Sequence, residues 1–437
     1  MRADRRAPRE LEITGLSHDG RGVAKVEGKT VFVGGALAGE RVMAQVYKRG
    51  RRFDEANTVE VLEASADRVA PECEYFGVCA GCAMQHLAFP KQIEAKQQVL
   101  ADNLERLGEV EPGRWLAPLQ SPPWGYRRRA RLSVRDVPKK GRVLVGFRES
   151  NGRYVADIQS CPVLDPRIGT LLPALSELIG KLSVRAQVPQ IEVSVGDVGV
   201  ALVLRHMAEL TASDKTELSD FAQTHEITLY TQSKGPNTVA YLAGPEQPMR
   251  YAIEAFDVDY EFSPADFIQV NAAMNQLMVA QAVDLLQLDP TDRVLDLYCG
   301  LGNFSLPLAR SGALICGVEG APELVERARS NAARQDLSVQ FEVADLMADH
   351  ADAGWAKTDW NKMLLDPPRA GAAEVLKYLP GKGVERVVYV SCHPGSLARD
   401  AGTLVRDHGY TLTAAGVMDM FPHTAHVESI AVFDRAR

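Results

Sequence analysis

Short runs of alternating apolar and polar residues follow one another through the first 67 residues of the chain. Five of them, RELEITGL, GVAKVEG, KTVFVGG, ERVMAQVYKR and ANTVEVLE, are separated by glycine-rich turns. A period of two predicts strands with one buried face, and five strands at this spacing predict a small barrel over residues 1–67. One predicted hairpin tip carries four cations that suit either an RNA backbone or solvent: Lys48, Arg49, Arg51 and Arg52.

Residues 68–264 are predicted to form a central β-rich domain that includes a helical part. Apolar residues recur at helical spacing at Ile93, Leu100, Leu104 and Leu107. We expect the helical part near 91–120 to pack on the C-terminal domain. Strand-like runs such as VGVALVLRH then fill the stretch from 191 to 243.

The most basic segment of the chain lies within this central domain. Its cations alternate with apolar residues as they do in strands, so they should line one surface rather than scatter. RNA backbone contact is the favoured interpretation, and a merely solvated face is the alternative. The cations are Arg127, Arg128, Arg129, Arg131, Arg135, Lys139, Lys140, Arg142 and Arg148.

From residue 265 to residue 437 the pattern changes to strands that alternate with helices. One such helix carries Met274, Met278, Ala282 and Leu286 on its apolar face. Alternation of this kind predicts an α/β domain with a Rossmann-like, mainly parallel sheet. The chain is therefore expected to have several domains, with the barrel first and the α/β domain last.

Composition limits the classes of function. The 437 residues are 46% hydrophobic and 24% charged, as in ordinary globular proteins, and no apolar run reaches membrane-spanning length. The N-terminus has no apolar signal segment, so we expect a cytoplasmic protein with reduced cysteines. We also expect a monomer. A net charge of -8 argues against indiscriminate nucleic-acid binding, so we expect local patches to select RNA and expect no DNA or membrane partner.

Four of the seven cysteines form a candidate metal set. Cys73, Cys79 and Cys82 lie within ten residues, and the distant Cys161 is followed by proline. Thiolates at such spacing hold iron–sulfur clusters or zinc, and the spacing alone does not choose between them. The alternative is that these are unrelated small core residues.

The sequence DRVLDLYCGLGNFSL predicts a strand that runs into a glycine loop and then a helix. Gly300 and Gly302 would let the backbone approach a ligand closely, and the helix N-terminus offers free N–H groups. The next strand ends on Glu319, which is placed to accept two ribose hydroxyls. Together with Asp345 and LLDPPR at 364–369, this stretch resembles the cofactor fold of S-adenosylmethionine-dependent methyltransferases.

A second candidate site lies in VVYVSCHPGSLARD, at 387–400. Its β-branched and aromatic run, bounded by proline and glycine, predicts a buried strand that ends at a presented thiol, Cys392. The carboxyl end of a strand is where open α/β sheets bind ligands. Taken alone, Cys392 would more often be a buried structural cysteine, and the motifs around it favour a functional thiol.

These motifs together resemble one family. ADFIQVN, DLYCGLGNFSL, LLDPPR, YVSCHP and HVESI resemble the RNA 5-methyluridine methyltransferases, and the barrel with four cysteines resembles the 23S ribosomal RNA member that has a TRAM domain and a 4Fe-4S cluster. The resemblance implies 23S ribosomal RNA as partner, S-adenosylmethionine as cofactor and a cluster rather than zinc on Cys73, Cys79, Cys82 and Cys161. It places the cofactor at Gln269, Tyr298, Asn303, Glu319, Asp345 and Asp366, the nucleophile at Cys392 and the base at Glu428.

The chemistry of uracil methylation calls for the same groups. C5 of uracil attacks a methyl donor poorly until a thiolate adds at C6, and Cys392 would supply that thiolate. The C5 proton must then be removed before the thiolate can leave. Glu428 is a lone carboxylate entering an apolar strand, where burial could raise its pKa toward neutrality. Otherwise it is an edge-strand acid, and Asp366 could orient the base or contact the cofactor.

Three other functions must be distinguished from uracil C5 methylation of 23S ribosomal RNA. A transfer RNA uracil methyltransferase would share Cys392 and Glu428, but we expect it to lack both the barrel and the four cysteines. An exocyclic-amine methyltransferase would have an aromatic residue where this chain has Arg369, and it would need no thiol. A non-catalytic RNA-binding factor would leave the presented cysteine and the glycine loop unexplained.

Overall fold

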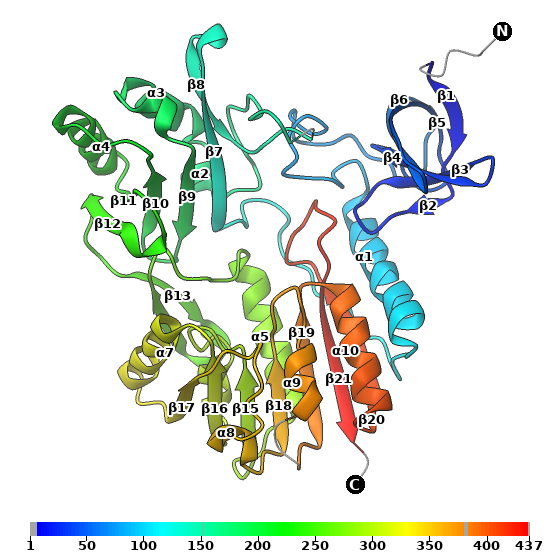
Figure 1. Ribbon diagram of the computed structural model, residues 1–437, viewed down its shortest axis with the longest axis vertical. Coiled ribbons are helices and arrows are strands. Elements are labelled where there is room, and N and C mark those ends of the chain that lie inside the picture. The colour runs from blue at the N-terminus through cyan, green and yellow to red at the C-terminus, as the bar shows by residue number, and fades with distance from the viewer. Residues whose placement is uncertain (1–6, 151, 380–382, 436–437) are drawn as a thin grey trace. The chain divides into compact units, whose positions relative to one another are not determined.

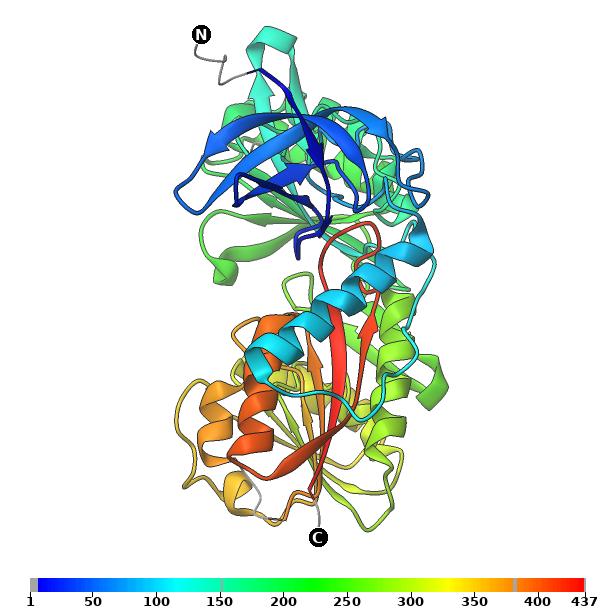
Figure 2. The ribbon, with the colours of Figure 1, turned by 90° about the vertical axis from the view of Figure 1, so that its right-hand side faces the viewer.

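The computed structural model describes residues 7–150, 152–379 and 383–435 (Figures 1 and 2). The chain divides into two compact units. Unit 1 consists of Met1–Val99, Arg148–Tyr154 and Phe421–His426, and unit 2 consists of Leu100–Phe147, Val155–Met420 and Val427–Arg437. Within the described ranges, no helix combines the length and the apolar character needed to cross a membrane.

A six-stranded barrel sheet forms the first part of unit 1, one strand more than the five predicted. Its order is β1-β5-β6-β4-β3-β2, and the alternating apolar residues point into one core. The predicted cationic tip does join two strands, β5 and β6. The strands are β1 (Arg9–Glu12), β2 (Gly15–Leu16), β3 (Gly22–Val26), β4 (Lys29–Gly34), β5 (Arg41–Arg49) and β6 (Phe53–Glu63).

The predicted amphipathic helix is α1 (Phe89–Asn103), which continues into a π-helical turn, η1 (Leu104–Gly108). Leu100 and Leu104 are buried as predicted, but Leu107 is 58% exposed. The wider i→i+5 turn explains this error, because it rotates Leu107 away from the face that a regular helix would present. In unit 2, Arg406 of α10 (Pro394–Arg406) donates to the carbonyl of Gly108 at 2.7 Å.

Unit 2 begins with a central six-stranded sheet in the order β12-β11-β10-β9-β7-β8. Its strands are β7 (Arg129–Val137), β8 (Arg142–Gly146), β9 (Gln190–Val195), β10 (Val200–Arg205), β11 (Thr228–Gln232) and β12 (Val239–Ala243). The accompanying helices are α2 (Pro166–Gly169), α3 (Leu172–Lys181) and α4 (Ala212–Thr224). Leu132 and Val134 are buried while Arg131 and Arg135 are exposed, so β7 presents cations on one face as predicted.

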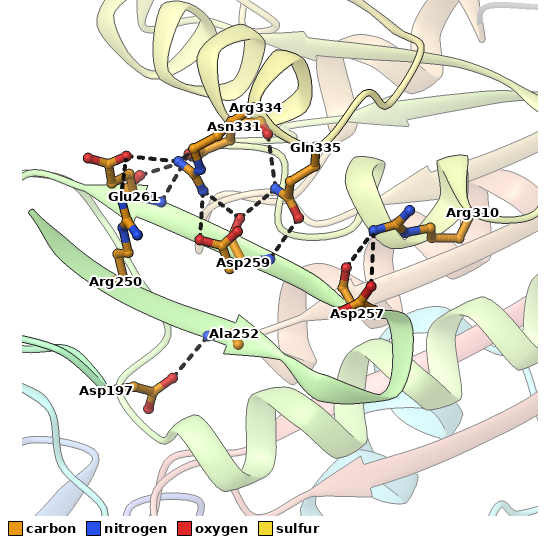
Figure 3. Close-up of polar contacts among 10 residues, drawn as sticks. All are labelled: Asp197, Arg250, Ala252, Asp257, Asp259, Glu261, Arg310, Asn331, Arg334 and Gln335. Atoms are coloured by element: carbon orange, nitrogen blue, oxygen red, sulfur yellow. Dashed lines mark hydrogen bonds and ion pairs between the residues drawn. The ribbon is translucent and has the colours of Figure 1, made fainter.

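A two-stranded hairpin, β13 (Met249–Ile253) and β14 (Val258–Phe262), follows the central sheet. Asp197, in the β9–β10 turn, accepts from the backbone N–H of Ala252 at 2.9 Å. On the other side, Arg334 of α7 (Pro322–Arg334) donates to the carboxylates of Asp259 and Glu261, each at 2.9 Å (Figure 3). Polar contacts therefore fix the hairpin to both the central sheet and α7.

The C-terminal part of unit 2 is a seven-stranded sheet in the order β17-β16-β15-β18-β19-β21-β20. Six strands run in the same direction, and β21, which lies between β19 and β20, is antiparallel to both of its neighbours. Its strands are β15 (Arg293–Leu297), β16 (Leu314–Glu319), β17 (Val339–Val343), β18 (Lys362–Leu365), β19 (Arg386–Ser391), β20 (Tyr410–Met418) and β21 (Glu428–Arg435).

Helices cover both faces of this sheet, with α9 and α10 on one side and α5 on the other (Figure 2). The remaining helices of this part are α5 (Ala272–Leu286), α6 (Ser305–Ala309), α8 (Gly354–Lys357) and α9 (Ala373–Tyr378). The predicted Rossmann-like domain is therefore present. Strand order reverses at β15, which places the ligand edge at the carboxyl ends of β15, β16 and β18.

Candidate active site

The glycine loop leaves β15 and is held by the acid that ends β16. The carboxylate of Glu319 accepts from the N–H of Gly300 at 3.1 Å and from the N–H of Ala321 at 3.0 Å. Gly300 and Gly302 both have positive φ, and a side chain on Gly302 would collide with Leu306. Each oxygen of Glu319 keeps a further lone pair, so the carboxylate can still accept ribose hydroxyls.

Tyr298 begins this loop in a left-handed conformation, with φ of 65°, that residues other than glycine rarely adopt. Burial, followed by the nearby Tyr378, Asp400, Asp345 and Glu319, raises the pKa of its hydroxyl. Among the described residues, that hydroxyl is buried without a hydrogen-bond partner. A buried hydroxyl without a partner, on a residue in a strained backbone conformation, suits a site that a ligand completes.

Asn303 lies in a side-chain network that sequence reasoning missed. Its Oδ1 accepts from the hydroxyl of Tyr251 at 2.9 Å and from Asn275 at 3.0 Å, and its Nδ2 donates back to Asn275 at 3.0 Å. Tyr260 donates to the carbonyl of Asn303 at 3.0 Å and stacks on Tyr251 with ring centroids 4.6 Å apart. The one signal in the sequence was Asn275, an amide within the apolar face of α5.

Two further predicted cofactor residues, Asp345 and Gln269, lie outside this loop. Asp345 is the second residue after β17 and is exposed, and the N–H of Ala344 beside it donates to the carbonyl of Glu319 at 3.0 Å. Gln269 is half-buried in the segment before α5. That segment is held by the N–H of Arg128, which donates to the carbonyl of Val270 at 2.8 Å.

The candidate nucleophile and base lie side by side because two strands pair in one register. Ser391, the last residue of β19, is opposite Ser429 of the antiparallel β21, and the Ser429 hydroxyl donates to the Ser391 carbonyl at 3.3 Å. The next pair of positions toward the ligand edge is Cys392 and Glu428. Two residues that are distant in sequence thus meet at the carboxyl end of β19.

Burial is the main cause that raises the pKa of the Cys392 thiol to about 11. The negative charges of Glu428 and Asp366 raise it further, while the positive charge of Arg369 lowers it. The thiol of the RNA-free protein is therefore protonated at neutral pH. Addition to a base must be coupled to loss of this proton.

Asp366 and Arg369 lie on the loop that follows β18. Burial raises the pKa of Asp366 to about 7. Asp400 on α10 anchors the far end of the loop, because its buried carboxylate accepts from the N–H of Ala372 at 2.7 Å and from the hydroxyl of Tyr389 at 2.7 Å. One helix therefore links the loop to β19, the strand that directly precedes Cys392.

Two known protein families match this chain. Residues 88–436 match the family described as tRNA (uracil-5-)-methyltransferase, and residues 4–56 match the TRAM domain. The chain belongs to this uracil-5-methyltransferase family. The family resemblance inferred from the sequence motifs is therefore confirmed, and the barrel sheet is a TRAM domain.

Relatives within the uracil-5-methyltransferase family extend along the whole chain. The "23S rRNA (uracil(1939)-C(5))-methyltransferase RlmD" of Stenotrophomonas maltophilia is 54% identical over 434 residues, 98% of each chain. The protein of the same name from Alkalilimnicola ehrlichii is 54% identical and covers 98% of this chain and 97% of its own. The solved structure of Pyrococcus abyssi tRNA (uracil-54, C5)-methyltransferase with S-adenosyl-L-homocysteine has a TM-score of 0.72 at 25% identity, covering 97% of this chain and 100% of its own.

The Pyrococcus abyssi structure corrects one expectation from the sequence. We expected a transfer RNA uracil methyltransferase to lack the barrel, but coverage of 97% of this chain extends over the barrel too. A barrel in this part of the chain therefore does not exclude a transfer RNA substrate. Within this family, the barrel is not the feature that separates the two classes.

The electrostatics of the site lead to a test on the isolated uracil-5-methyltransferase. Because the charge of Glu428 raises the pKa of Cys392, Glu428→Gln should lower that pKa and speed alkylation of Cys392 by iodoacetamide several-fold at mildly alkaline pH. Peptide mass spectrometry would measure the rate, with Glu342→Gln on β17 as control. An unchanged or slower rate would show that the two groups do not interact.

Proposed function

We propose that this methyltransferase moves a methyl group from S-adenosylmethionine to C5 of a uracil in 23S ribosomal RNA. The observation that carries the proposal is the register of β19 and β21, which brings a buried carboxylate, Glu428, beside a thiol, Cys392. Uracil C5 methylation requires both groups, whereas exocyclic-amine methylation requires neither. The same pair argues against a purely RNA-binding role.

In the proposed reaction, the Cys392 thiol loses its proton to solvent and its sulfur adds to C6 of the uracil, and the electrons of the C5–C6 double bond make C5 nucleophilic. S-adenosylmethionine supplies the methyl group that C5 takes. Glu428 then removes the C5 proton, the C5–H electrons restore the C5–C6 double bond, and the C6–S bond breaks to release Cys392. Asp366, with its raised pKa, either accepts the imide proton of uracil or contacts the cofactor.

The residues around the glycine loop suit the cofactor. Glu319 is positioned for the ribose hydroxyls, and the orphan hydroxyl of Tyr298 borders the same loop. Asn303 would act chiefly by holding the loop, because Tyr251 and Asn275 occupy its side-chain amide. Gln269 and Asp345 complete the proposed set.

The choice of 23S over transfer RNA rests on the relatives. The 54% identical proteins that extend over the whole chain are named for 23S rRNA, whereas the transfer RNA enzyme is 25% identical. The exposed cations of β7 and of the β5–β6 tip support an RNA partner. We further propose a monomeric, cytoplasmic enzyme without DNA or membrane partners, and three domains with the limits 1–67, 68–264 and 265–437.

An experiment with methyl-labelled cofactor tests which RNA is the substrate. Equal amounts of unmodified 23S rRNA and unmodified transfer RNA are incubated with enzyme, and the label is mapped by nuclease digestion and mass spectrometry. We expect 5-methyluridine at one position of 23S rRNA and none in transfer RNA. Label in transfer RNA alone would favour the alternative transfer RNA enzyme, and N-methylated bases would contradict C5 chemistry.

We also propose that Cys73, Cys79, Cys82 and Cys161 hold a 4Fe-4S cluster rather than zinc. All four are thiols, and Cys79 accepts an N–H···S hydrogen bond from Gly81 at 3.4 Å, the kind of contact that tunes such clusters. Cys161 belongs to unit 2 and the other three to unit 1. No group of three or more metal-ligating side chains is assembled in the part of the chain that the structure describes, so the proposal rests on ligand type, spacing and family resemblance.

The metal proposal predicts a colour. Protein purified without added metal should be brown and contain about four iron atoms per chain. Cys73→Ser should lose the colour and lower RNA affinity more than it slows methyl transfer, while Cys316→Ser, which alters a thiol on β16, should keep the colour. Colourless protein with one zinc per chain would reassign the site.

A further inference from the structure

The loop between β20 and β21 lies in unit 1 although both of its strands lie in unit 2. Its residues Phe421–His426 group with the barrel and the cysteine segment, whereas Met420 before it and Val427 after it group with the catalytic sheet. His423, at the middle, is 5% exposed and has a φ of 65°. A buried non-glycine residue in this conformation must be held by its surroundings.

Gln92 of α1 holds His423 in this conformation through hydrogen bonds. Its side-chain oxygen accepts from the N–H of His423 at 2.9 Å, and its amide nitrogen lies 3.3 Å from His423 Nδ1. The same nitrogen donates to the carbonyls of Met84 at 3.1 Å and Leu87 at 2.9 Å. Gln92 is 1% exposed, so these hydrogen bonds form without competition from water.

The cysteine segment completes the attachment. The N–H groups of Ala83 and Met84, directly after Cys82, both donate to the carbonyl of His423 at 2.9 Å. The buried Lys96, one turn along α1 from Gln92, donates to the carbonyl of Phe421 at 3.0 Å. We call Gln92, Lys96, Ala83 and Met84 the loop clamp.

The clamped loop leads directly into the proposed base. Glu428 is the second residue after His426 and the first residue of β21, and its backbone pairs with Met418, the last residue of β20. A side chain at the first position of a strand takes its direction partly from the chain that enters it. The loop clamp fixes that entering chain.

We propose that Gln92 is a positioning residue for Glu428. This inference rests on the proposed function, in which Glu428 removes the C5 proton after methyl transfer. That step forms a bond between the proton and a Glu428 oxygen, and it breaks the C5–H and C6–S bonds. Displacement of the carboxylate slows this step alone, because Cys392 and the cofactor loop are carried by other strands.

The test compares Gln92→Met with Gln97→Met. Methionine preserves the volume of Gln92 but cannot make its hydrogen bonds, and Gln97 lies on the same helix outside the clamp. Natural RNA and methyl-labelled cofactor are used, and denaturing gels measure the labelled protein–RNA adduct. Gln92→Met should lower turnover about 10- to 100-fold, accumulate adduct, and leave the single-turnover methyl-transfer rate within about twofold. Gln97→Met should behave like wild type.

Two outcomes would overturn the inference. If turnover of Gln92→Met falls without adduct, or if RNA affinity falls by the same factor, the loop clamp serves folding or RNA binding instead. Should circular dichroism show that Gln92→Met is unfolded, Lys96→Met becomes the decisive variant. Adduct accumulation there supports the inference, and wild-type turnover refutes it.

Glu428→Gln is measured in parallel to separate this inference from the proposed function. If Glu428→Gln accumulates adduct and the folded Gln92→Met does not, only the positioning role of Gln92 fails. If Glu428→Gln accumulates none, Glu428 is not the base, and the inference fails together with that part of the proposed function. Accumulation in both variants supports both statements.

Discussion

Replacement of Cys392 by alanine is expected to abolish covalent capture of RNA. With RNA that contains 5-fluorouracil in place of uracil, the wild-type enzyme and S-adenosylmethionine should form a complex that survives denaturation, because fluorine blocks the final proton removal. Cys392→Ala has no sulfur to add at C6 and should form none. Methylation of natural RNA should fall by roughly 10⁴-fold or more, the scale of losing a nucleophile.

The matched control is Cys316→Ala, which removes a buried thiol from the same domain. It should retain both the complex and most of the activity, since Cys316 lies within β16 rather than at a strand end. A denaturation-resistant complex with Cys392→Ala would assign the nucleophile elsewhere. Absence of the complex with wild-type enzyme would remove the covalent mechanism altogether.

Replacement of Glu428 by glutamine should stop the reaction one step later. Glutamine keeps the size and part of the hydrogen bonding of Glu428 but cannot accept a proton. The variant should bind RNA normally, form the Cys392 adduct, transfer the methyl group and then stall. Loss of a general base typically costs about 10²- to 10⁴-fold in turnover. A denaturing gel with natural RNA and methyl-labelled cofactor should show labelled adduct for Glu428→Gln and little for wild type.

Glu342→Gln on the exposed side of β17 provides the control, and it should turn over like wild type. Wild-type turnover by Glu428→Gln would instead leave Glu428 as a strand residue only. The base would then be sought near the nucleophile. His393 is the first candidate, although its Nδ1 already accepts from the N–H of Ser396 at 3.1 Å as the cap of α10.

The order of residues within short segments was enough to predict the strand and the loop that carry the proposed nucleophile and cofactor site. The β-branched run before Cys392 predicts a strand end, and the glycine loop before Asn303 predicts the strand-to-helix turn; the structure has both. Each prediction depends on residues within about ten positions of one another. Leu107 shows the limit of this reasoning, because a π-helical turn has no clear sequence period.

Contacts between distant residues could not be predicted in this way. Sequence reasoning assigned Cys392 and Glu428 from their motifs, but only the pairing of Ser391 with Ser429 shows that they meet. Tyr251 and Asn275 hold Asn303 through contacts that carry no local pattern. Gln92 and His423 are separated by 331 positions, and nothing in either neighbourhood indicates the other.

The membership of Phe421–His426 in unit 1 has a consequence for biosynthesis. Domains generally fold from the N-terminus as they leave the ribosome, at about 5 to 20 residues per second. Unit 1 cannot do so completely, because its last residues follow its first 99 by roughly 300 positions and so by roughly 15 to 65 s of translation. During that interval Gln92, Met84 and Leu87 lack the loop that covers them. The nascent unit 1, with the segment that carries Cys73, Cys79 and Cys82, should therefore be most open to chaperones until Phe421–His426 have been made.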